Sequence, residues 1–307
     1  MLRLLRPSTS SPDALDRLTG FLMRAITKQL GALPSAVLRQ HYVKPGNYMQ
    51  VEEDSQHREI AVMRMNRPPF NGFSKDFMDE FRASLGRLEN STTCRGVVIT
   101  SANPGIFSAG LDIAELHQQS DAHLSALWQS LQEFFLALYG TRLVTVAAVN
   151  GHATAGGCLM SLSCDYRLMA EGQYSVGFST SRLGIITPFW VQEVMKRSCG
   201  SRTAEMSFQL GTLYSPREAL SIGLVDEVVG QTDILSSARE QLLRWLAIPE
   251  DARVTTKKML KGPLLEELRR KKEEEIAFFV DFIQRDTVQR AIGRFMETLK
   301  RRKQPGS

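Results

Sequence analysis

The fold is decided by two glycine-bearing stretches, Phe107-Ser108-Ala109-Gly110-Leu111-Asp112 and Asn150-Gly151-His152-Ala153-Thr154-Ala155-Gly156-Gly157-Cys158. Each follows an apolar run of β-type residues, at 96–100 and at 143–149. A single glycine turn after a strand usually does no more than let the next element pack closely. Two such turns can, however, aim two backbone N–H groups at one point, and such a pair stabilises an oxygen atom that becomes negative during a reaction.

Apolar periodicity around these stretches predicts alternating strands and helices. We expect strands at 59–65, 96–100, 143–149 and 166–170, and helices at 73–88, from Asp112 onward, at 121–139 and at 156–163. Ser74 is the expected N-cap of the first helix, and the chain beyond Pro188 is expected to be mostly helical. Strands that alternate with helices indicate an α/β fold with a parallel sheet.

Length and composition narrow the class of protein. A chain of 307 residues suits one large domain with appendages or two domains, and 43% hydrophobic residues is ordinary for a soluble globular protein. No apolar run reaches the eighteen residues of a membrane span. The four cysteines form no CxxC pair, which favours a reducing compartment without a disulfide framework.

The net charge of +5 belongs to the N-terminal segment. Residues 1–44 hold seven Lys or Arg and two Asp, whereas the rest of the chain holds 31 basic and 31 acidic residues. Serine-rich sequence with spaced arginines is typical of a mitochondrial transit peptide, although a basic tail or a docking helix has the same composition. We therefore expect an N-terminal extension at 1–44 and location in the mitochondrial matrix.

Both glycine stretches resemble those of the crotonase (enoyl-CoA hydratase/isomerase) superfamily, and the Cys164-Asp165-Tyr166-Arg167 segment extends the match. The resemblance implies a ββα spiral core at 45–245 and a C-terminal helical region at 246–307. It also implies that the Leu111 and Gly156 N–H groups form an oxyanion hole for the carbonyl of an acyl-CoA thioester. The remaining substrate-binding positions that it implies are Ser108, Ala109, Gly110, Asp112 and Gly157, with Ser108 and Ala109 near the adenine end of CoA. A structural role near a helix start is the simpler interpretation of Asp112.

The segment Leu183-Gly184-Ile185-Ile186-Thr187-Pro188-Phe189-Trp190 resembles the mitochondrial Δ3,Δ2-enoyl-CoA isomerases of that superfamily. This resemblance covers about residues 58–300 and implies that Phe189 and Trp190 line the acyl pocket, although aromatic residues there also pack as core. A homotrimer, a CoA thioester as substrate, no separate cofactor and no metal are further implications. In the C-terminal region, Ile276, Phe279, Val280 and Ile283 form an apolar stripe at helical spacing.

The chemistry implied is a double-bond shift through an enolate, in which one carboxylate serves as base and then as acid. Leu159 stands where hydratases carry a glutamate, which favours the isomerase. The position that matches the isomerase glutamate is Thr180, and a hydroxyl is a poor base near neutral pH. Three carboxylates could replace it, although each has an ordinary structural interpretation: Asp112, Glu115 and Glu193. Arg182, close to Thr180 in the sequence, could hold a ligand or face solvent.

Three functions remain open at this stage. The first is an isomerase of 3-enoyl-CoA in fatty acid β-oxidation, with a relocated base. The second is a crotonase homologue that binds acyl-CoA but turns it over slowly or not at all. The third is nucleic-acid binding, suggested only by the pI of about 9.1. We expect no nucleic-acid partner, because residues 45–307 carry no net charge and nucleic-acid binding depends on a basic surface.

Overall fold

The computed structural model describes residues 46–303, and side chains within them as far as Thr298. The extension expected at 1–44 lies outside the described residues, so the transit-peptide hypothesis and the three-part division of the chain stay predictions. No helix within the described part is both long enough and apolar enough to cross a membrane.

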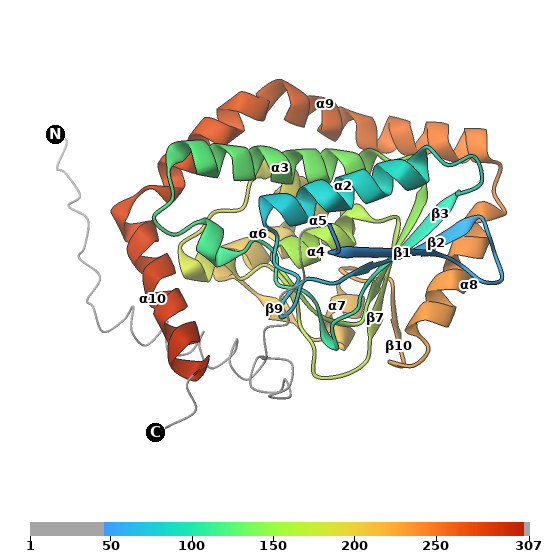
Figure 1. The fold of residues 1–307 in the computed structure, drawn as a ribbon, viewed down its shortest axis with the longest axis horizontal. Coiled ribbons are helices and arrows are strands. Elements are labelled where there is room, and N and C mark those ends of the chain that lie inside the picture. The colour runs from blue at the N-terminus through green and yellow to red at the C-terminus, as the bar shows by residue number, and fades with distance from the viewer. Residues whose placement is uncertain (1–45, 304–307) are drawn as a thin grey trace.

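A six-stranded sheet forms the centre of the molecule (Figure 1). Its strands run in the order β1-β2-β3-β5-β7-β10, and every neighbouring pair is parallel except β1 and β2. The bounds are β1 Met49–Glu53, β2 Ile60–Met65, β3 Gly96–Ser101, β5 Val144–Val149, β7 Tyr166–Ala170 and β10 Glu227–Val229. The predicted parallel α/β sheet is thereby confirmed, and β1 and β10 are additions to it.

Side chains of these strands alternate between two cores, because successive residues of a strand point to opposite faces of its sheet. Ile60, Val62 and Val98 face α8 (Ile234–Leu246), whereas Met63 and Val97 face the main helical layer. That layer lies over the other face of the sheet (Figure 1). It includes α2 Lys75–Glu89, α3 Asp121–Gly140, α4 Gly156–Ser163, α5 Phe189–Cys199 and α9 Glu250–Ile283.

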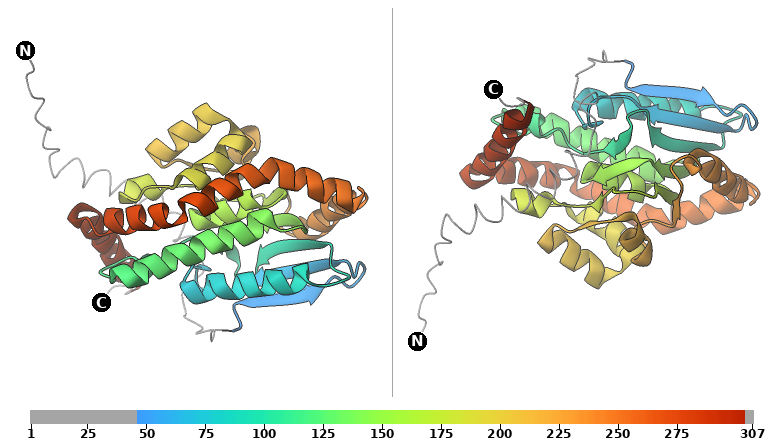
Figure 2. Two further views of the ribbon diagram at one scale, coloured as in Figure 1. Left: turned by 90° about the horizontal axis from the view of Figure 1, so that it is seen from above. Right: turned by 90° about the horizontal axis from the view of Figure 1, so that it is seen from below.

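The first helix of the layer forms as predicted. Ser74 is the N-cap of α2, and its hydroxyl accepts a hydrogen bond from the Phe77 N–H at 3.3 Å. Phe77, Phe81 and Leu85 recur at every fourth position and are buried, so one face of α2 packs against the core. The long helix α9 runs alongside α3 across the molecule (Figure 2), and its predicted apolar stripe faces this core.

A second sheet was not predicted and lies where the two glycine stretches begin. Its strands run in the order β4-β6-β8-β9. They are β4 Gly105–Ser108, β6 Gly151–Thr154, β8 Val176–Gly177 and β9 Leu213–Tyr214. Strands of two to four residues are too short to show alternation in a sequence. The helix expected from Asp112 is also wrong, because only a single 3₁₀ turn, η1 Ile113–Glu115, follows Asp112.

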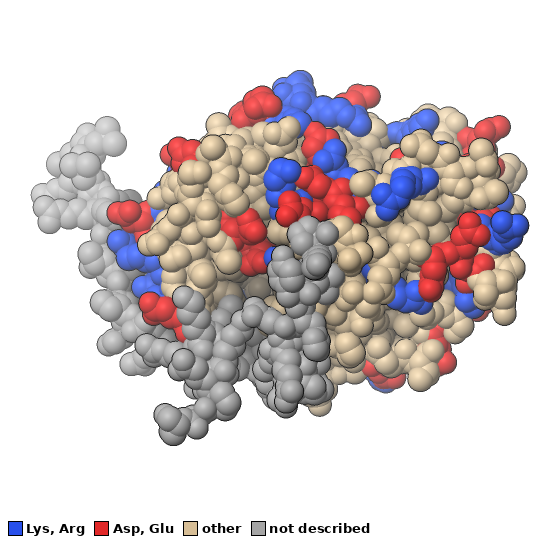
Figure 3. All heavy atoms as spheres, in the orientation of Figure 1, with Lys and Arg blue, Asp and Glu red and all other residues tan. Residues whose placement is uncertain are grey.

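The C-terminal half is mostly helical, as expected. It comprises η2 Thr180–Leu183, α5, α6 Ser201–Leu210, α7 Pro216–Ser221, α8, α9 and α10 Asp286–Lys303. On the face drawn in Figure 3, basic and acidic side chains are interspersed rather than separated.

Candidate active site

The first glycine stretch presents a backbone N–H group that has no acceptor in the described part of the chain. Phe73 forms a parallel bridge with Leu111, in which the Phe73 N–H donates to the Gly110 carbonyl at 2.7 Å and the Asp112 N–H donates to the Phe73 carbonyl at 3.2 Å. In a parallel bridge, the residue between the two bonded positions points its own N–H away from the partner strand. Here that residue is Leu111, between Gly110 and Asp112. The Leu111 N–H therefore has no hydrogen-bond partner among residues 46–303.

The second N–H group belongs to the first residue of α4. The opening N–H groups of a helix have no partner inside it, and Gly156 finds none elsewhere in the described part of the chain. Ala155, the residue before it, has a φ of +50° and offers no side-chain cap. The Gly156 N–H thus has no acceptor among the described residues, and the role that the family resemblance implies for it stays a prediction.

The two donors lie on segments in direct contact. A Cβ atom added to Gly110 would stand 2.2 Å from the Gly156 nitrogen, and one added to Gly156 would stand 2.8 Å from the Gly110 Cα. A Cβ on Gly157 would reach 2.2 Å from the Ser108 carbonyl oxygen. Only glycine permits these backbone approaches, and they bring the Leu111 and Gly156 N–H groups together. Two unpartnered N–H groups side by side can stabilise one negative oxygen.

A buried polar network holds the first stretch in place. The Ser108 hydroxyl donates to the Asn71 carbonyl at 2.8 Å and accepts from the Gly110 N–H at 3.1 Å. The Asn71 amide donates to the Phe107 carbonyl at 2.9 Å and to the Ser101 hydroxyl at 2.7 Å. Asn71 escaped the sequence analysis, although asparagine after Pro-Pro-Phe is a turn residue that tolerates its φ of +49°.

Ala109 and Asp112, two further residues of this stretch that the resemblance assigns to substrate binding, have different surroundings. Ala109 is exposed, and its N–H donates to the Phe70 carbonyl at 3.0 Å. Asp112 accepts from the Ala114 N–H at 3.2 Å and forms an ion pair with Arg67 at 2.9 Å, which is the structural role expected of it.

His152, in the second stretch, is neutral at physiological pH. Its ring is buried, and its Nδ1 accepts a hydrogen bond from the Ser175 N–H at 3.1 Å. Burial lowers the pKa of His152 to about 4. An imidazole with so low a pKa is a weak general base.

Thr180 opens η2, and its hydroxyl is paired with another hydroxyl. The two oxygens, Thr180 Oγ1 and Thr187 Oγ1, lie 2.9 Å apart. Arg182, in the same turn, donates from Nε to the Leu210 carbonyl at 2.7 Å. The Arg182 guanidinium therefore contacts the backbone. Within the described part of the chain, no carboxylate forms a hydrogen bond with the Thr180 hydroxyl.

Each carboxylate considered as a replacement base is already paired with a cation or an imidazole. Asp112 pairs with Arg67, Glu193 pairs with Lys196 at 2.6 Å, and Glu115 lies 2.8 Å from a His123 nitrogen. These contacts give each of the three carboxylates a structural role.

The two aromatic residues after Pro188 differ in exposure. Trp190 is fully buried and packs against Phe135, with ring centroids 4.6 Å apart, and against Trp128 at 6.4 Å. Phe189 is partly buried under Lys271, whose ammonium nitrogen lies 4.8 Å from the ring centroid. Trp190 is therefore a residue of the hydrophobic core, whereas Phe189 lies at the surface of this core.

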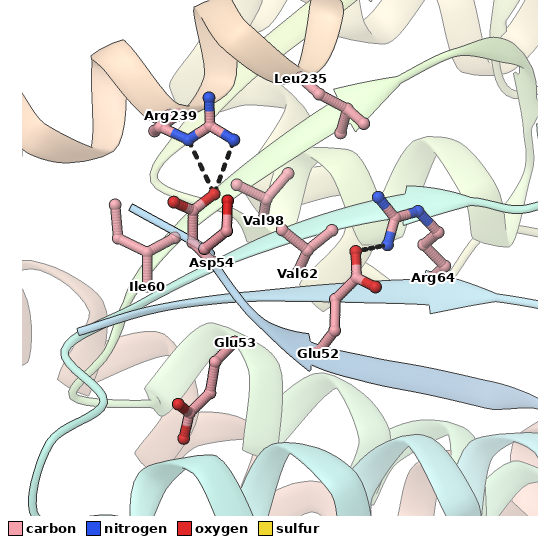
Figure 4. A pocket seen from close by; sticks show the side chains of 10 residues that line it. Glu52, Glu53, Asp54, Ile60, Val62, Arg64, Val98, Leu235 and Arg239 are labelled. Atoms are coloured by element: carbon pink, nitrogen blue, oxygen red, sulfur yellow. Dashed lines mark hydrogen bonds and ion pairs between the residues drawn. The ribbon is translucent and has the colours of Figure 1, made fainter. Parts of the chain in front are cut away.

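A separate pocket of about 240 Å³ lies between α8 and the strands β1, β2 and β3 (Figure 4). Four of its five charged side chains form ion pairs within it, since Arg239 pairs with Asp54 at 2.7 Å and Arg64 pairs with Glu52, while Glu53 is the fifth. Neither Leu111 nor Gly156 lines it, so the pocket and the pair of N–H donors are different places. The described residues contain no cluster of three or more potential metal ligands.

Comparison with known proteins identifies the family. The family model described as enoyl-CoA hydratase/isomerase matches residues 55–304. The chain belongs to the enoyl-CoA hydratase/isomerase family. Members similar to it include the mitochondrial enoyl-CoA delta isomerase 1 of Rattus norvegicus, 44% identical over 80% of this chain and 85% of the relative. The Homo sapiens protein of that name is 42% identical over 80% of this chain and 81% of its own.

A solved structure of the family agrees with the fold. The crystal structure of human mitochondrial delta3-delta2-enoyl-CoA isomerase superposes with a TM-score of 0.82 at 40% identity, over 84% of this chain and all of that one. An enoyl-CoA hydratase from Bacillus halodurans, 24% identical, gives a TM-score of 0.73 over 81% of this chain and all of its own, and shares the fold. The crotonase-type fold expected from the glycine stretches is confirmed.

Proposed function

We propose that this protein binds an acyl-CoA thioester at the Leu111 and Gly156 N–H groups and isomerises 3-enoyl-CoA to trans-2-enoyl-CoA. The observation that carries the proposal is the pair of adjacent backbone donors without an acceptor. In the reaction a proton leaves the carbon beside the thioester carbonyl, and charge moves to the carbonyl oxygen. Two donors aimed at that oxygen stabilise the enolate, and a proton is then returned two carbons further along.

The substrate class and the place in β-oxidation are supported by the relatives, which are named enoyl-CoA delta isomerases. Leu159, buried in α4, stands at the position of a hydratase glutamate and leaves no second carboxylate there to activate water. This residue supports isomerisation over hydration.

One observation favours a second candidate function. The position of the isomerase glutamate holds Thr180, whose hydroxyl is occupied by Thr187. Loss of a general base typically lowers a rate by about 10²–10⁴-fold. The second candidate is therefore a protein that binds acyl-CoA in the same place and turns it over slowly or not at all.

Restoring the carboxylate separates the two candidates. Thr180→Glu is expected to raise turnover of a 3-enoyl-CoA by about 10²-fold or more, because a carboxylate returns to the position that matches the isomerase glutamate. Thr180→Gln is the matched control, since it has the same length without basicity, and its turnover is expected to stay at the wild-type level. Turnover is followed spectrophotometrically with a 3-enoyl-CoA substrate.

The outcomes of this experiment are distinct. A fast wild type that Thr180→Glu leaves unchanged would place the base elsewhere, and Asp112→Asn, Glu115→Gln and Glu193→Gln would then identify it. If neither the wild type nor Thr180→Glu turns over while acyl-CoA still binds, the second candidate is correct. Undetectable binding of acyl-CoA at millimolar concentration would reject both.

The assembly proposed is a homotrimer. Large apolar side chains are exposed on α6, at Met206 and Leu210, and on α9, at Met259 and Leu260, where they are 44% to 73% exposed. Contact with a second subunit would bury these side chains, and for this reason we assign them to the proposed interface. Light scattering of the purified protein is expected to give three times the chain mass, and Leu260→Glu is expected to lower it.

The proposed location is the mitochondrial matrix. The relatives named above are mitochondrial, and the basic segment at 1–44 has transit-peptide composition. Mass spectrometry of the mature protein is expected to find its N-terminus downstream of residue 15, and a cytosolic protein that begins at Met1 would reject this location.

A further inference from the structure

The segment that follows the Leu111 donor has little regular structure of its own. After Asp112 and the single turn η1, residues 116–119 run toward the start of α3 without forming a helix or a strand. Gln118 has a φ of +52°, a left-handed conformation that is uncommon for a residue other than glycine. Such a conformation persists where the surrounding structure imposes it, so contacts from other elements must hold this segment.

Those contacts come from the junction of α9 and α10. The Gln289 carboxamide accepts a hydrogen bond from the Gln118 N–H at 2.8 Å and donates to the Leu116 carbonyl at 3.0 Å. The same Nε2 donates to the Ile283 carbonyl at 2.9 Å, at the end of α9. One side chain therefore joins the end of α9 to two backbone groups of the segment.

A second glutamine adds to this clamp, by which we mean the side chains of Gln284 and Gln289. Gln284 Nε2 donates to the Gln119 carbonyl at 2.9 Å and to Asp121 Oδ1, in the first turn of α3, at 2.8 Å. Within the described part of the chain, every hydrogen bond between the backbone of 116–119 and a distant segment comes from the clamp. The clamp therefore decides where this segment lies.

The helix α10 also contacts both parts of the candidate active site. Gly293 approaches His117 so closely that an added Cβ would stand 3.0 Å from the His117 Nε2. A Cβ on Gly184, the residue that ends η2, would lie 4.0 Å from the Ala291 Cβ. Because η2 begins at Thr180, α10 connects the segment after the Leu111 donor with the turn that carries Thr180.

The path from the clamp to the donor is short and packed. Leu116 is 1% exposed, and Leu111 and Ile113 pack against the same core. The bridge with Phe73 holds the chain at Leu111, and Gln289 holds it at Leu116. With both ends held, the direction of the Leu111 N–H is fixed before a ligand arrives, which is what stabilisation of an oxyanion by preorganised donors requires.

We propose that Gln289 is a positioning residue for the Leu111 N–H, a role that rests on the proposed function. It acts through the backbone between Leu116 and Leu111 rather than by contact with the substrate. Without its carboxamide, the segment loses two backbone hydrogen bonds, one of them at the left-handed Gln118. The Leu111 N–H then shifts relative to the Gly156 N–H, and the two donors no longer converge on one oxygen.

The test is difference infrared spectroscopy of the full-length protein with octanoyl-CoA that is isotopically labelled at its thioester carbonyl. Hydrogen bonds from two converging donors polarise a carbonyl and lower its stretching frequency, so the wild type is expected to lower the frequency relative to free octanoyl-CoA. Gln289→Met keeps the length of the side chain without its hydrogen bonds and is expected to lose most of this shift. Its dissociation constant for octanoyl-CoA is expected to stay within about tenfold of the wild-type value.

Gln241→Met is the matched control. Gln241 lies on α8 and donates to Glu227 Oε2 at 3.1 Å, so its substitution removes a side-chain hydrogen bond in another part of the fold. This variant is expected to keep the full shift. If Gln289→Met does not fold, Gln284→Met removes the other half of the clamp at an exposed position and is expected to lose part of the shift.

The outcomes separate this inference from the proposed function. A wild type that fails to bind octanoyl-CoA, or binds it without a shift of the carbonyl frequency, would reject the oxyanion hole and both proposals with it. A wild type that shows the shift, together with a full shift in every clamp variant that folds, would leave the proposed function standing and overturn the role of Gln289.

Discussion

Gly110→Ala is expected to damage the candidate oxyanion hole directly. Gly110 has a φ of +81°, and a Cβ atom there would lie 2.2 Å from the Gly156 nitrogen and 2.9 Å from the Gly156 Cα. Ordinary contact begins at 3.4 Å, so the two backbone segments must separate by about 1.2 Å. Because both colliding atoms belong to the backbone, no side-chain rotation relieves the clash.

The magnitude follows from this displacement. A shift of about 1 Å in a catalytic group can lower a rate by about 10²-fold. Binding of the ground state is affected less. One hydrogen bond to a carbonyl contributes about 1 kcal/mol, so its loss raises the dissociation constant by roughly tenfold at most. The left-handed backbone adds about 1–2 kcal/mol of strain to the folded state.

The assay is isothermal titration with a saturated acyl-CoA, together with turnover of 3-enoyl-CoA by Gly110→Ala in the Thr180→Glu background. Gly86→Ala is the matched control, because Gly86 lies inside α2 and an added Cβ would meet nothing within 4 Å. This control is expected to gain about 0.5–1 kcal/mol of stability and to bind acyl-CoA normally. A Gly110→Ala protein that melts and binds like the wild type would refute the reasoning.

Two further predictions concern stability. Asp165→Asn is expected to cost about 3–5 kcal/mol in urea unfolding, because Lys257 and Lys261 would remain buried without their carboxylate. Burial alone would raise the pKa of Asp165, but the two lysines outweigh it and bring the pKa down to about 2. Since this pKa lies below the unfolded value, the stability that Asp165 contributes is full above about pH 4 and is lost as the pH falls toward 2; an Asp165→Asn protein should not show this loss. Ser215→Ala removes the capping box with Glu218 at the start of α7 and should cost about 1 kcal/mol, measured by thermal unfolding.

Local patterns in the sequence determined the main strands, the long helices and the glycine stretches. They also placed Ser74 at a helix start. These features depend on neighbours within a few residues, on apolar spacing, or on residue types that a turn requires, so they are visible without a fold. The helix expected from Asp112 was wrong because a carboxylate cap begins a 3₁₀ turn as readily as a longer helix.

Only the tertiary structure decided which groups remain without partners. The second sheet pairs strands of two to four residues that lie far apart in the chain, and Asn71 supports Ser108 across 37 positions. The sharing of Glu250 by Arg95 and Arg142 likewise joins residues that lie far apart in the chain. A sequence shows which donors and charges a chain possesses, but whether each is satisfied depends on contacts between distant segments, and these contacts exist only once the chain has folded.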